Sequence, residues 1–315
     1  MGVSTWRHVA QRDTGRFVRL SEKSAGDTMT YSDQWLASAN SYNNGRPYLA
    51  SKWQQVQTVV GAVADGIPGD ETAAKVGQWQ AGHDLVEDGK VGTTTLYAMG
   101  LGFFTLYGNK SFGWNGKGSV CADGGPSAYH PENIGYDYLA NAGWPGSGYG
   151  LSKDASGQPY VQGMDDPRPG YYVSTTAMNR SGFDPSDPRR FVDAERVPYI
   201  VLPKNLADLL PSEYRPSKGA VARISGPDRV SMAIYAEVGP AWKIGADSKH
   251  GEASIAALEA VGHDPWEYKS ELWRAKMSAS DISYQVWAGS NDRAEIIDGP
   301  RGQSLVVDGR RVGCP

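Results

Sequence analysis

Two copies of one short motif constrain the fold of this chain more than any other feature of its sequence. The run DGIPGDET at residues 65–72 recurs as DGKVGTTT at residues 88–95, and each copy leads into a helix-like stretch. The glycines of this DGxxGxxT pattern permit positive φ angles, and its aspartate can accept hydrogen bonds from backbone N–H groups in the turn. The threonine or a neighbour can cap the helix that follows. The repeat predicts a compact unit of short helices, joined by two matching turns, over residues 51–100.

Residues 51–100 also resemble the type 1 peptidoglycan-binding domain. Besides the doubled motif, the resemblance is carried by Val56-Gln57, Gln78-Trp79-Gln80, Asp84-Leu85 and Leu96. It implies that the unit binds cell-wall glycan or stem peptide. The repeated glycines and aspartates build turns and need not touch a ligand themselves.

Length and composition limit the classes of partner. A chain of 315 residues can hold two domains, and its formal net charge of −4 argues against nucleic acid, which needs a basic surface. Without an apolar run of about 18 residues, no membrane span is expected. The first residues lack the apolar stretch of a secretory signal peptide. Residues 1–50 are polar, with a helix-like stretch over 32–40, and suggest no role beyond a linker or packing arm.

After residue 100 the sequence changes to short β-rich runs separated by glycine, proline and aromatic residues. We expect strands at 170–176, 197–203, 221–224 and 230–238, a last pair at 282–288 and 304–307, and one helix at 254–261. This pattern predicts a multidomain α+β protein, in which a small helical module precedes a mainly-β barrel or sandwich over residues 101–315. Its two cysteines, Cys121 and Cys314, either pair or stay free.

Several carboxylates in this second domain stand in unusual local settings. Asp123 lies in a Gly-rich loop, Asp193 and Glu195 directly precede a strand, and Glu237 ends an apolar strand. Burial in such a strand raises the pKa of a carboxyl, which suits a general acid. Glu252 stands near the start of the predicted helix, where the helix dipole would favour the ionised form and suit a general base. Cleavage of a glycosidic bond needs such a pair of carboxyl groups.

Residues 119–290 resemble glycoside hydrolase family 75, the chitosanases. The matching stretches are 122–124, 128–131, 137–143, 169–176, RFVDAERVPYIVLP at 190–203, 233–240 and 251–255. The resemblance implies endo-hydrolysis of β-1,4-linked glucosamine polymers, with inversion, by two acidic residues, which fall on Glu237 and Glu252. The first position is commonly Asp in the family, and residues 241–250 are an insertion. Either departure can alter the separation of the carboxylates, which decides between inversion and retention.

On these grounds the expected catalytic residues are Glu237, Glu252 and Asp193. The expected substrate contacts are Asp123, Tyr172, Glu195 and His250, with neither a metal nor a cofactor. The stretch 233–261 is also similar to the strand-to-helix unit of double-psi β-barrels, which favours that fold and raises lytic transglycosylation as a rival reaction. The substrate is expected to be peptidoglycan, including N-deacetylated forms. The alternatives are chitosan hydrolysis and wall binding without catalysis.

The wall-directed module and the missing signal peptide together suggest an antibacterial effector or a phage-type lysin. Such a protein would be secreted and would act in the periplasm or cell wall of a target cell. An effector of this kind would have an immunity protein as a partner, besides its polysaccharide substrate.

Overall fold

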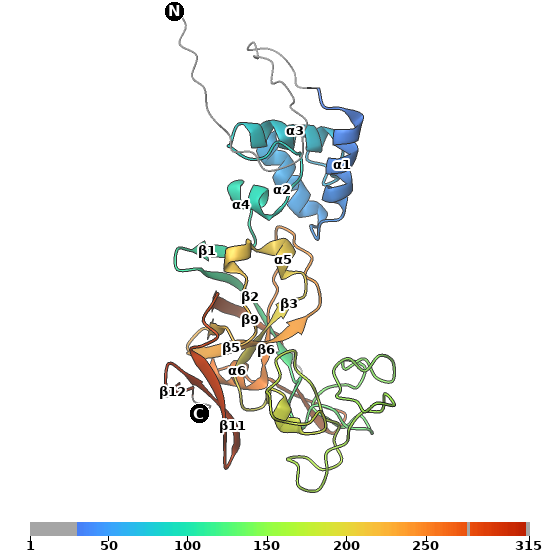
Figure 1. Ribbon diagram of the computed structural model, residues 1–315, viewed down its shortest axis with the longest axis vertical. Helices are drawn as coiled ribbons and strands as arrows, with labels where there is room; N and C mark the ends of the chain where they lie inside the picture. The colour runs from blue at the N-terminus through green and yellow to red at the C-terminus, as the bar shows by residue number, and fades with distance from the viewer. Residues whose placement is uncertain (1–29, 276–277, 313–315) are drawn as a thin grey trace, which may run out of the picture.

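A helical module forms the N-terminal part of the protein, in a computed structural model that describes residues 30–275 and 278–312. Its helices are α1 (Asp33–Asn44), α2 (Ala50–Val60), α3 (Asp70–Ala81) and α4 (Thr93–Ala98), and Figure 1 shows them gathered at one end of the molecule. Most of the segment 1–50 lies outside the described residues, since the description begins at residue 30. The module therefore contains the short helices and turns that the repeat predicts.

The two copies of the repeated motif are held by the same set of hydrogen bonds. The buried Gln57 amide donates to Asp65 Oδ1 (2.7 Å), Ile67 O (3.0 Å) and Thr72 Oγ1 (3.0 Å), and its oxygen accepts from Gly66 N (2.8 Å). Gln80 repeats each bond 23 positions later, with Asp88, Lys90, Thr95 and Gly89. The threonines therefore bind glutamine instead of capping a helix, and the residues preceding α3 and α4 are Gly69 and Gly92, which make no side-chain cap.

Helix α1 packs on this repeat unit. Asn43 is buried and joins the second turn, because its amide donates to Gly89 O (3.0 Å) and its oxygen accepts from Val91 N (2.8 Å). The ring of Trp35 lies so close to Gly77 and Gly89 that a Cβ on either glycine would overlap it. Residues 30–44, for which the sequence alone suggested no role, thus cover one side of the module.

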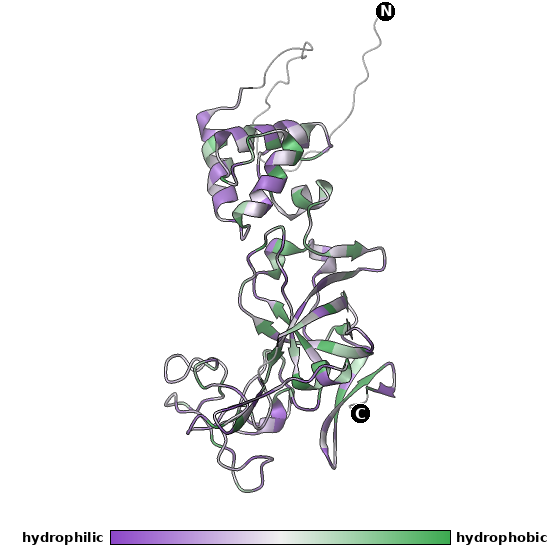
Figure 2. Ribbon diagram, turned by 180° about the vertical axis from the view of Figure 1, so that it is seen from behind, coloured by the Kyte–Doolittle hydropathy of each residue, from purple (hydrophilic) through white to green (hydrophobic). Residues whose placement is uncertain are grey.

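A closed barrel of six strands forms the centre of the second part of the chain. Its strands pair in the order β2 (Ser111–Cys121), β6 (Glu252–Ser254), β3 (Tyr199–Pro203), β5 (Val230–Gly239), β4 (Val221–Ser225) and β9 (Ser278–Trp287), and β9 pairs back onto β2. The pairs β2–β6 and β3–β5 are parallel, and the other pairs are antiparallel. Figure 2 shows both hydrophobic and polar stretches along the barrel strands, and every residue of β3 is buried.

Smaller elements surround the barrel. Helix α6 (Ile255–Ala260) follows β6, while α5 (Leu206–Leu209) and the 3-10 turn η2 (Ser212–Tyr214) connect β3 to β4. A short strand β1 (Thr105–Tyr107) pairs with β2. The hairpin β7–β8 (Trp266–Lys269, Leu272–Ala275) and the sheet β10–β12 (Ala294–Gly299, Gly302–Val307, Arg310–Arg311) lie outside the barrel, and η1 (Pro188–Arg190) interrupts the long loops between β2 and β3.

The strand expected at 170–176 does not form. Its backbone N–H groups bind separate loops, as Tyr172 N does with Tyr129 O and Val173 N with Tyr160 O, so only isolated bridges result. The last two expected strands form as β9 and β11 but belong to different sheets. The sequence did not predict strand β2, because several glycines interrupt its pattern. Glycine is needed there because neighbouring backbone lies very close; a Cβ on Gly116, for example, would overlap the His250 carbonyl. The two parts of the chain are therefore a small helical module and a mainly-β region around a closed barrel.

One hydrophobic core runs through both parts of the chain. It contains Trp53, Val56 and Val76 of the module together with Phe104, Trp114 and Trp242 of the barrel region. At the junction, where Figure 1 shows α5 beneath the helices, Arg46 contacts Asp208 Oδ1 (3.0 Å) and Tyr97 Oη donates to Leu209 O (3.3 Å). The module is therefore packed onto the barrel over an apolar surface.

Candidate functional site

A cleft of about 540 Å³ opens where the carboxyl ends of β2, β3 and β5 meet the start of β6. Its walls bring together side chains from 120–123, from the loops at 129–150 and 175, and from 201–204, 237–240 and 252. The lining residues are Val120, Cys121, Ala122, Asp123, Tyr129, Asp137, Ala140, Asn141, Tyr149, Gly150, Thr175, Val201, Lys204, Glu237, Val238, Gly239, Pro240 and Glu252. Three of the residues singled out from the sequence, Asp123, Glu237 and Glu252, therefore share one cleft.

A bulge in β5 directs Glu237 toward this cleft. Tyr235 pairs with Ile200 and Glu237 with Val201, so Ala236 is an extra residue that bends the strand and alters the side-chain direction after it. The Glu237 carboxylate accepts hydrogen bonds from Ala177 N and Val238 N, both at 2.7 Å. Burial, and next the nearby Asp123 charge, raise the pKa of Glu237 to about 7, although the two backbone donors favour its ionised form.

Glu252 lies at the start of β6, where it pairs with Ser119 of β2. The cap of α6 is Ser254, whose Oγ accepts from Ala257 N (3.1 Å), so Glu252 stands outside the helix and the expected helix-dipole effect is wrong. Burial, followed by the Asp123 charge, raises the pKa of Glu252 to about 7. No backbone N–H of the described residues donates to this carboxyl, in contrast to Glu237, although a hydrogen bond with the Cys121 thiol favours its ionised form.

Asp123 connects the two glutamates electrostatically. It follows β2 and is held by two tyrosines, since Tyr129 Oη donates to Asp123 Oδ1 (2.7 Å) and Tyr199 Oη donates to Asp123 O (2.7 Å). Burial raises the pKa of Asp123 to about 6, against the effect of the Tyr129 hydrogen bond. Because its negative charge raises the pKa of both glutamates, protons at the three groups are coupled.

Further polar residues complete the cleft, and the sequence reasoning did not select them. Asp137 accepts from Asn141 Nδ2 (2.6 Å), and burial raises the pKa of Asp137. Tyr149 is 70% exposed although its hydroxyl is fixed to Asn141 O (2.7 Å), so it presents a positioned ring to solvent. Lys204 is the basic residue among the described lining residues. Asp137 and Asn141 stand in the stretch 137–143, which could have pointed to them.

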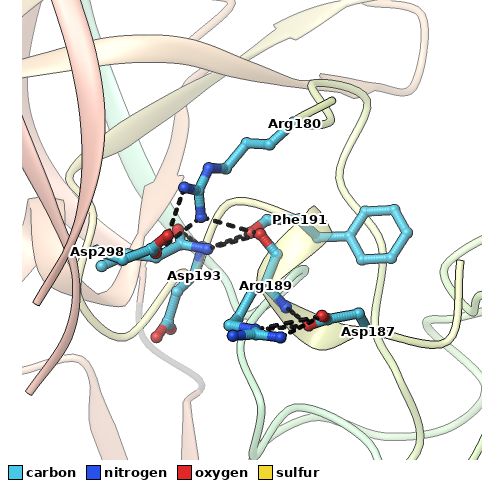
Figure 3. A network of polar contacts seen from close by, with 7 residues as sticks. Arg180, Asp187, Arg189, Phe191, Asp193 and Asp298 are labelled. Atoms are coloured by element: carbon cyan, nitrogen blue, oxygen red, sulfur yellow. Dashed lines mark hydrogen bonds and ion pairs between the residues drawn. The ribbon is translucent and has the colours of Figure 1, made fainter. Parts of the chain in front are cut away.

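Asp193 does not line this cleft. It lines a smaller cavity of about 220 Å³ with Gly124 and Gln303, and its backbone N–H donates to Gln303 Oε1 (3.0 Å). Figure 3 shows Asp193 in a polar network whose ion pairs are Arg180–Asp298 and Arg189–Asp187. Burial, and then the Glu195 charge, raise the pKa of Asp193 to about 7. Its side chain contacts its own loop, since Oδ1 accepts from Glu195 N (2.9 Å) and Oδ2 lies 3.8 Å from Arg196 Nε.

The other three expected substrate contacts also lie outside the cleft lining. Glu195 Oε1 accepts from Ser127 N (2.8 Å) and so supports the loop that follows Asp123. Tyr172 is half-buried and its ring packs near Trp144. The His250 ring stacks on Trp242, with 4.9 Å between ring centroids, and its Nε2 contacts Lys243 O (2.8 Å).

Three observations concern metal ligands, membrane-spanning helices and the two cysteines. In the stretches 30–275 and 278–312, no group of three or more His, Cys, Asp or Glu is arranged to hold a metal ion. Within those stretches, too, every helix is too short or too polar to cross a bilayer. Cys121 is buried, with its sulfur 3.2 Å from Tyr199 Oη, whereas Cys314 lies outside the described residues, and with it the question of their pairing.

Comparison with known proteins identifies the helical module. No curated protein matches the chain. A family model described as "Putative peptidoglycan binding domain" matches residues 54–99, which span α2, both repeated turns, α3 and α4. The chain thus carries a type 1 peptidoglycan-binding domain at residues 54–99, which indicates that it associates with cell walls through a polysaccharide partner.

Proposed function

We propose that the barrel cleft is the active site of an endo-acting glycoside hydrolase, which cleaves β-1,4 bonds in an amino-sugar polysaccharide of the cell wall. The observation that carries this proposal is the convergence of Glu237 and Glu252 in one cleft, with the pKa of each raised to about 7. Two carboxyl groups poised near neutral pH can hold one proton between them, as general acid–base cleavage of a glycoside requires.

The surroundings of the two glutamates favour different roles. Two backbone N–H groups donate to Glu237 and favour its ionised form, so we assign it the role of the general base that activates water. Among the described residues no backbone N–H donates to Glu252, and the Cys121 thiol alone hydrogen-bonds to it, so we assign Glu252 the role of the general acid that delivers a proton to the leaving oxygen. The negative charge of Asp123 raises the pKa of both glutamates and so favours a proton on one of them. This assignment reverses the roles that sequence position alone favoured.

The charge of the cleft favours a substrate with free amines. Asp123, Asp137, Glu237 and Glu252 face a cleft in which Lys204 is the basic lining residue among those described. Such a cleft attracts cationic glucosamine units by ordinary charge complementarity. Together with the wall-binding module, this favours N-deacetylated peptidoglycan as the substrate, and chitosan as the second candidate.

We further propose that the barrel is of the double-psi type and belongs with the family 75 chitosanases. Two parallel pairs, β2–β6 and β3–β5, within an otherwise antiparallel closed barrel support this assignment. The carboxylates Asp123, Glu237 and Glu252, which converge in the cleft, all stand in stretches that resemble that family.

Product analysis tests the proposal directly. Wild type, Glu237→Gln and Glu252→Gln would be incubated with peptidoglycan, N-deacetylated peptidoglycan and chitosan, and the products analysed by mass spectrometry. We expect ordinary reducing ends from the wild type and a loss of about 10²–10⁴-fold in each variant. Anhydro-sugar ends would identify a lytic transglycosylase. Wall binding without any product would identify a binding protein.

We also propose that the protein acts on the wall of another cell, as an antibacterial effector with an immunity protein as its partner. The wall-binding module supports this site of action. Expression in a bacterium with and without an added periplasmic signal, scored by lysis, tests it. Lysis only with the signal is expected, and lysis without it would contradict the proposal.

A further inference from the structure

The segment that joins the two cleft glutamates leaves the barrel and reaches the helical module. Glu237 stands near the end of β5 and Glu252 opens β6, so residues 240–251 alone connect the two strands along the chain. These residues include the insertion at 241–250 that distinguishes the sequence from family 75. What holds this segment therefore also holds the ends of the two strands that carry the glutamates.

The middle of the segment is hydrogen-bonded to the connection between α1 and α2. Ile244 forms a parallel bridge with Tyr48, in which Ile244 N donates to Pro47 O and Leu49 N donates to Ile244 O, both at 2.7 Å. Farther along, Ala246 N donates to Ser51 Oγ (3.1 Å). The Ile244 side chain is 1% exposed and belongs to the core shared with the module.

The two arms of the segment are fixed to the barrel region. On the Glu237 side, Trp242 exchanges two hydrogen bonds with Asn205 (2.9 and 3.1 Å), and its ring packs on Phe103 and Trp114. On the Glu252 side, His250 O accepts from Trp114 Nε1 (2.8 Å), and Gly251 O accepts from Ser119 N (3.0 Å). Between these fixed arms, the apex at Ile244 depends on the module for its partners.

We infer that the helical module is a positioning part of the catalytic cleft. Through its α1–α2 connection and Ser51, it sets the relative placement of Glu237 and Glu252 by way of Ile244. The inference rests on the proposed hydrolase function. A tether needs only a linker, whereas here the module satisfies the backbone of the segment between the two carboxyl groups. Without it, the Ile244 amide and carbonyl lose their partners and the Ile244 side chain loses its cover. Ile244 and Ser51 are thus positioning residues, since neither lines the cleft.

The test uses the full chain with the variants Ile244→Ala and Ser51→Ala, the conservative Ile244→Val, and the control Met164→Ala at an 88% exposed position. One measurement is the pKa of Glu237 and Glu252, from titration of their ¹³C-labelled carboxyl groups by NMR. The other is kcat and KM on a soluble glucosamine hexamer, for which wall anchoring is irrelevant. Thermal unfolding confirms that each variant is folded, and Ser51→Ala provides a milder change should Ile244→Ala unfold.

With a positioning role, kcat on the soluble hexamer falls about tenfold or more in Ile244→Ala while KM changes little, because misplaced catalytic groups slow the chemical step. The pKa of both glutamates moves toward its ordinary value, Ser51→Ala shifts them less, and Ile244→Val and Met164→Ala match the wild type. Unchanged pKa values and kcat in folded Ile244→Ala and Ser51→Ala overturn the inference. An inactive wild type whose pKa values still shift in Ile244→Ala overturns the proposed hydrolase function and leaves the positioning role standing.

Discussion

Replacing Glu252 by glutamine should stabilise the protein while it removes activity. The pKa of Glu252 is raised to about 7 from 4.5, mainly because burial disfavours its charge. At about 1.36 kcal/mol for each pH unit, this difference corresponds to about 3 kcal/mol of stability that the ionised side chain costs above pH 7. Glutamine has nearly the same shape and carries no charge, so Glu252→Gln avoids this cost.

The sign of the pH dependence follows from proton binding. Between pH 4.5 and about 7 the folded protein holds the Glu252 proton and the unfolded chain does not. The free energy of unfolding of the wild type therefore falls as pH rises through this window. In Glu252→Gln that contribution to the fall is absent, so wild type and variant have similar stability at pH 4 and differ most above pH 7.

Thermal unfolding followed by circular dichroism from pH 4 to pH 9 measures this difference. At about 2–4 °C for each kcal/mol in a domain of this size, Glu252→Gln should unfold about 6–12 °C higher than the wild type at pH 8.5. Glu237→Gln is the matched control. Its amide faces two backbone donors, Ala177 N and Val238 N, and leaves one of them unpaired. The unpaired N–H costs about 1–3 kcal/mol, which offsets most of the stability that Glu237→Gln gains by removing the charge. If Glu252→Gln is no more stable than the wild type at pH 8.5, then burial does not raise the free energy of the ionised Glu252 side chain as argued.

Three further changes test the cleft and the module. Tyr149→Ala should raise KM for a soluble oligosaccharide about tenfold, because the exposed and fixed ring offers a stacking surface worth about 1 kcal/mol or more. The unfolding temperature should not change. An unchanged KM would exclude the ring as a substrate contact. Gly239→Ala should lower kcat more than it raises KM. The new Cβ would lie 2.9 Å from Val201 Cγ1 and 3.5 Å from Glu252 Oε2, and would therefore crowd the Glu252 carboxyl. Wild-type kinetics would count against the close placement of Glu252 and Gly239. Gln80→Ala should destabilise the protein by about 2–3 kcal/mol in urea unfolding, because it removes the buried hydrogen-bond partner of Asp88, Lys90 and Thr95. Gln78→Ala is the control. Equal losses of unfolding free energy in the two variants would mean that the repeated hydrogen bonds are unimportant.

Local sequence was sufficient to predict the repeated turns and short helices of residues 51–100, although not the packing of α1 on them. Its turns depend on residues close together in the chain, such as Asp65, whose Oδ1 accepts from Ile67 N two residues later. Glycines with positive φ at Gly66 and Gly89 place the turns. The motif did not reveal the glutamine at the centre of each turn's hydrogen bonds. Gln57 and Gln80 lie eight residues before the aspartates to which they donate, outside the motif itself. The same 23-residue spacing of the two glutamines was present in the sequence and could have revealed them.

Local sequence was not sufficient to predict which carboxylates meet. Asp193 and Glu252 both stand in conspicuous settings, but the pairing of β2 with β6 brings Glu252 beside the end of β2, whereas Asp193 enters another cavity with Gln303. Asp137 reaches the cleft from a loop without regular strands. Which side chains converge depends on strand register between distant segments, including the bulge at Ala236.

By itself, then, the sequence determined the identity of the helical module and the residue types available for chemistry, because short-range turns and helix patterns are encoded within a few residues of each other. Only the tertiary structure decided the state of those residues. Burial raises the pKa of Glu237 and Glu252 to about 7, and backbone donors reach Glu237 but not Glu252 among the described residues. The tertiary structure likewise fastened the segment between them to the module at Ile244. Desolvation and hydrogen bonding at these sites come from chain segments far apart in sequence, so no local pattern could contain them.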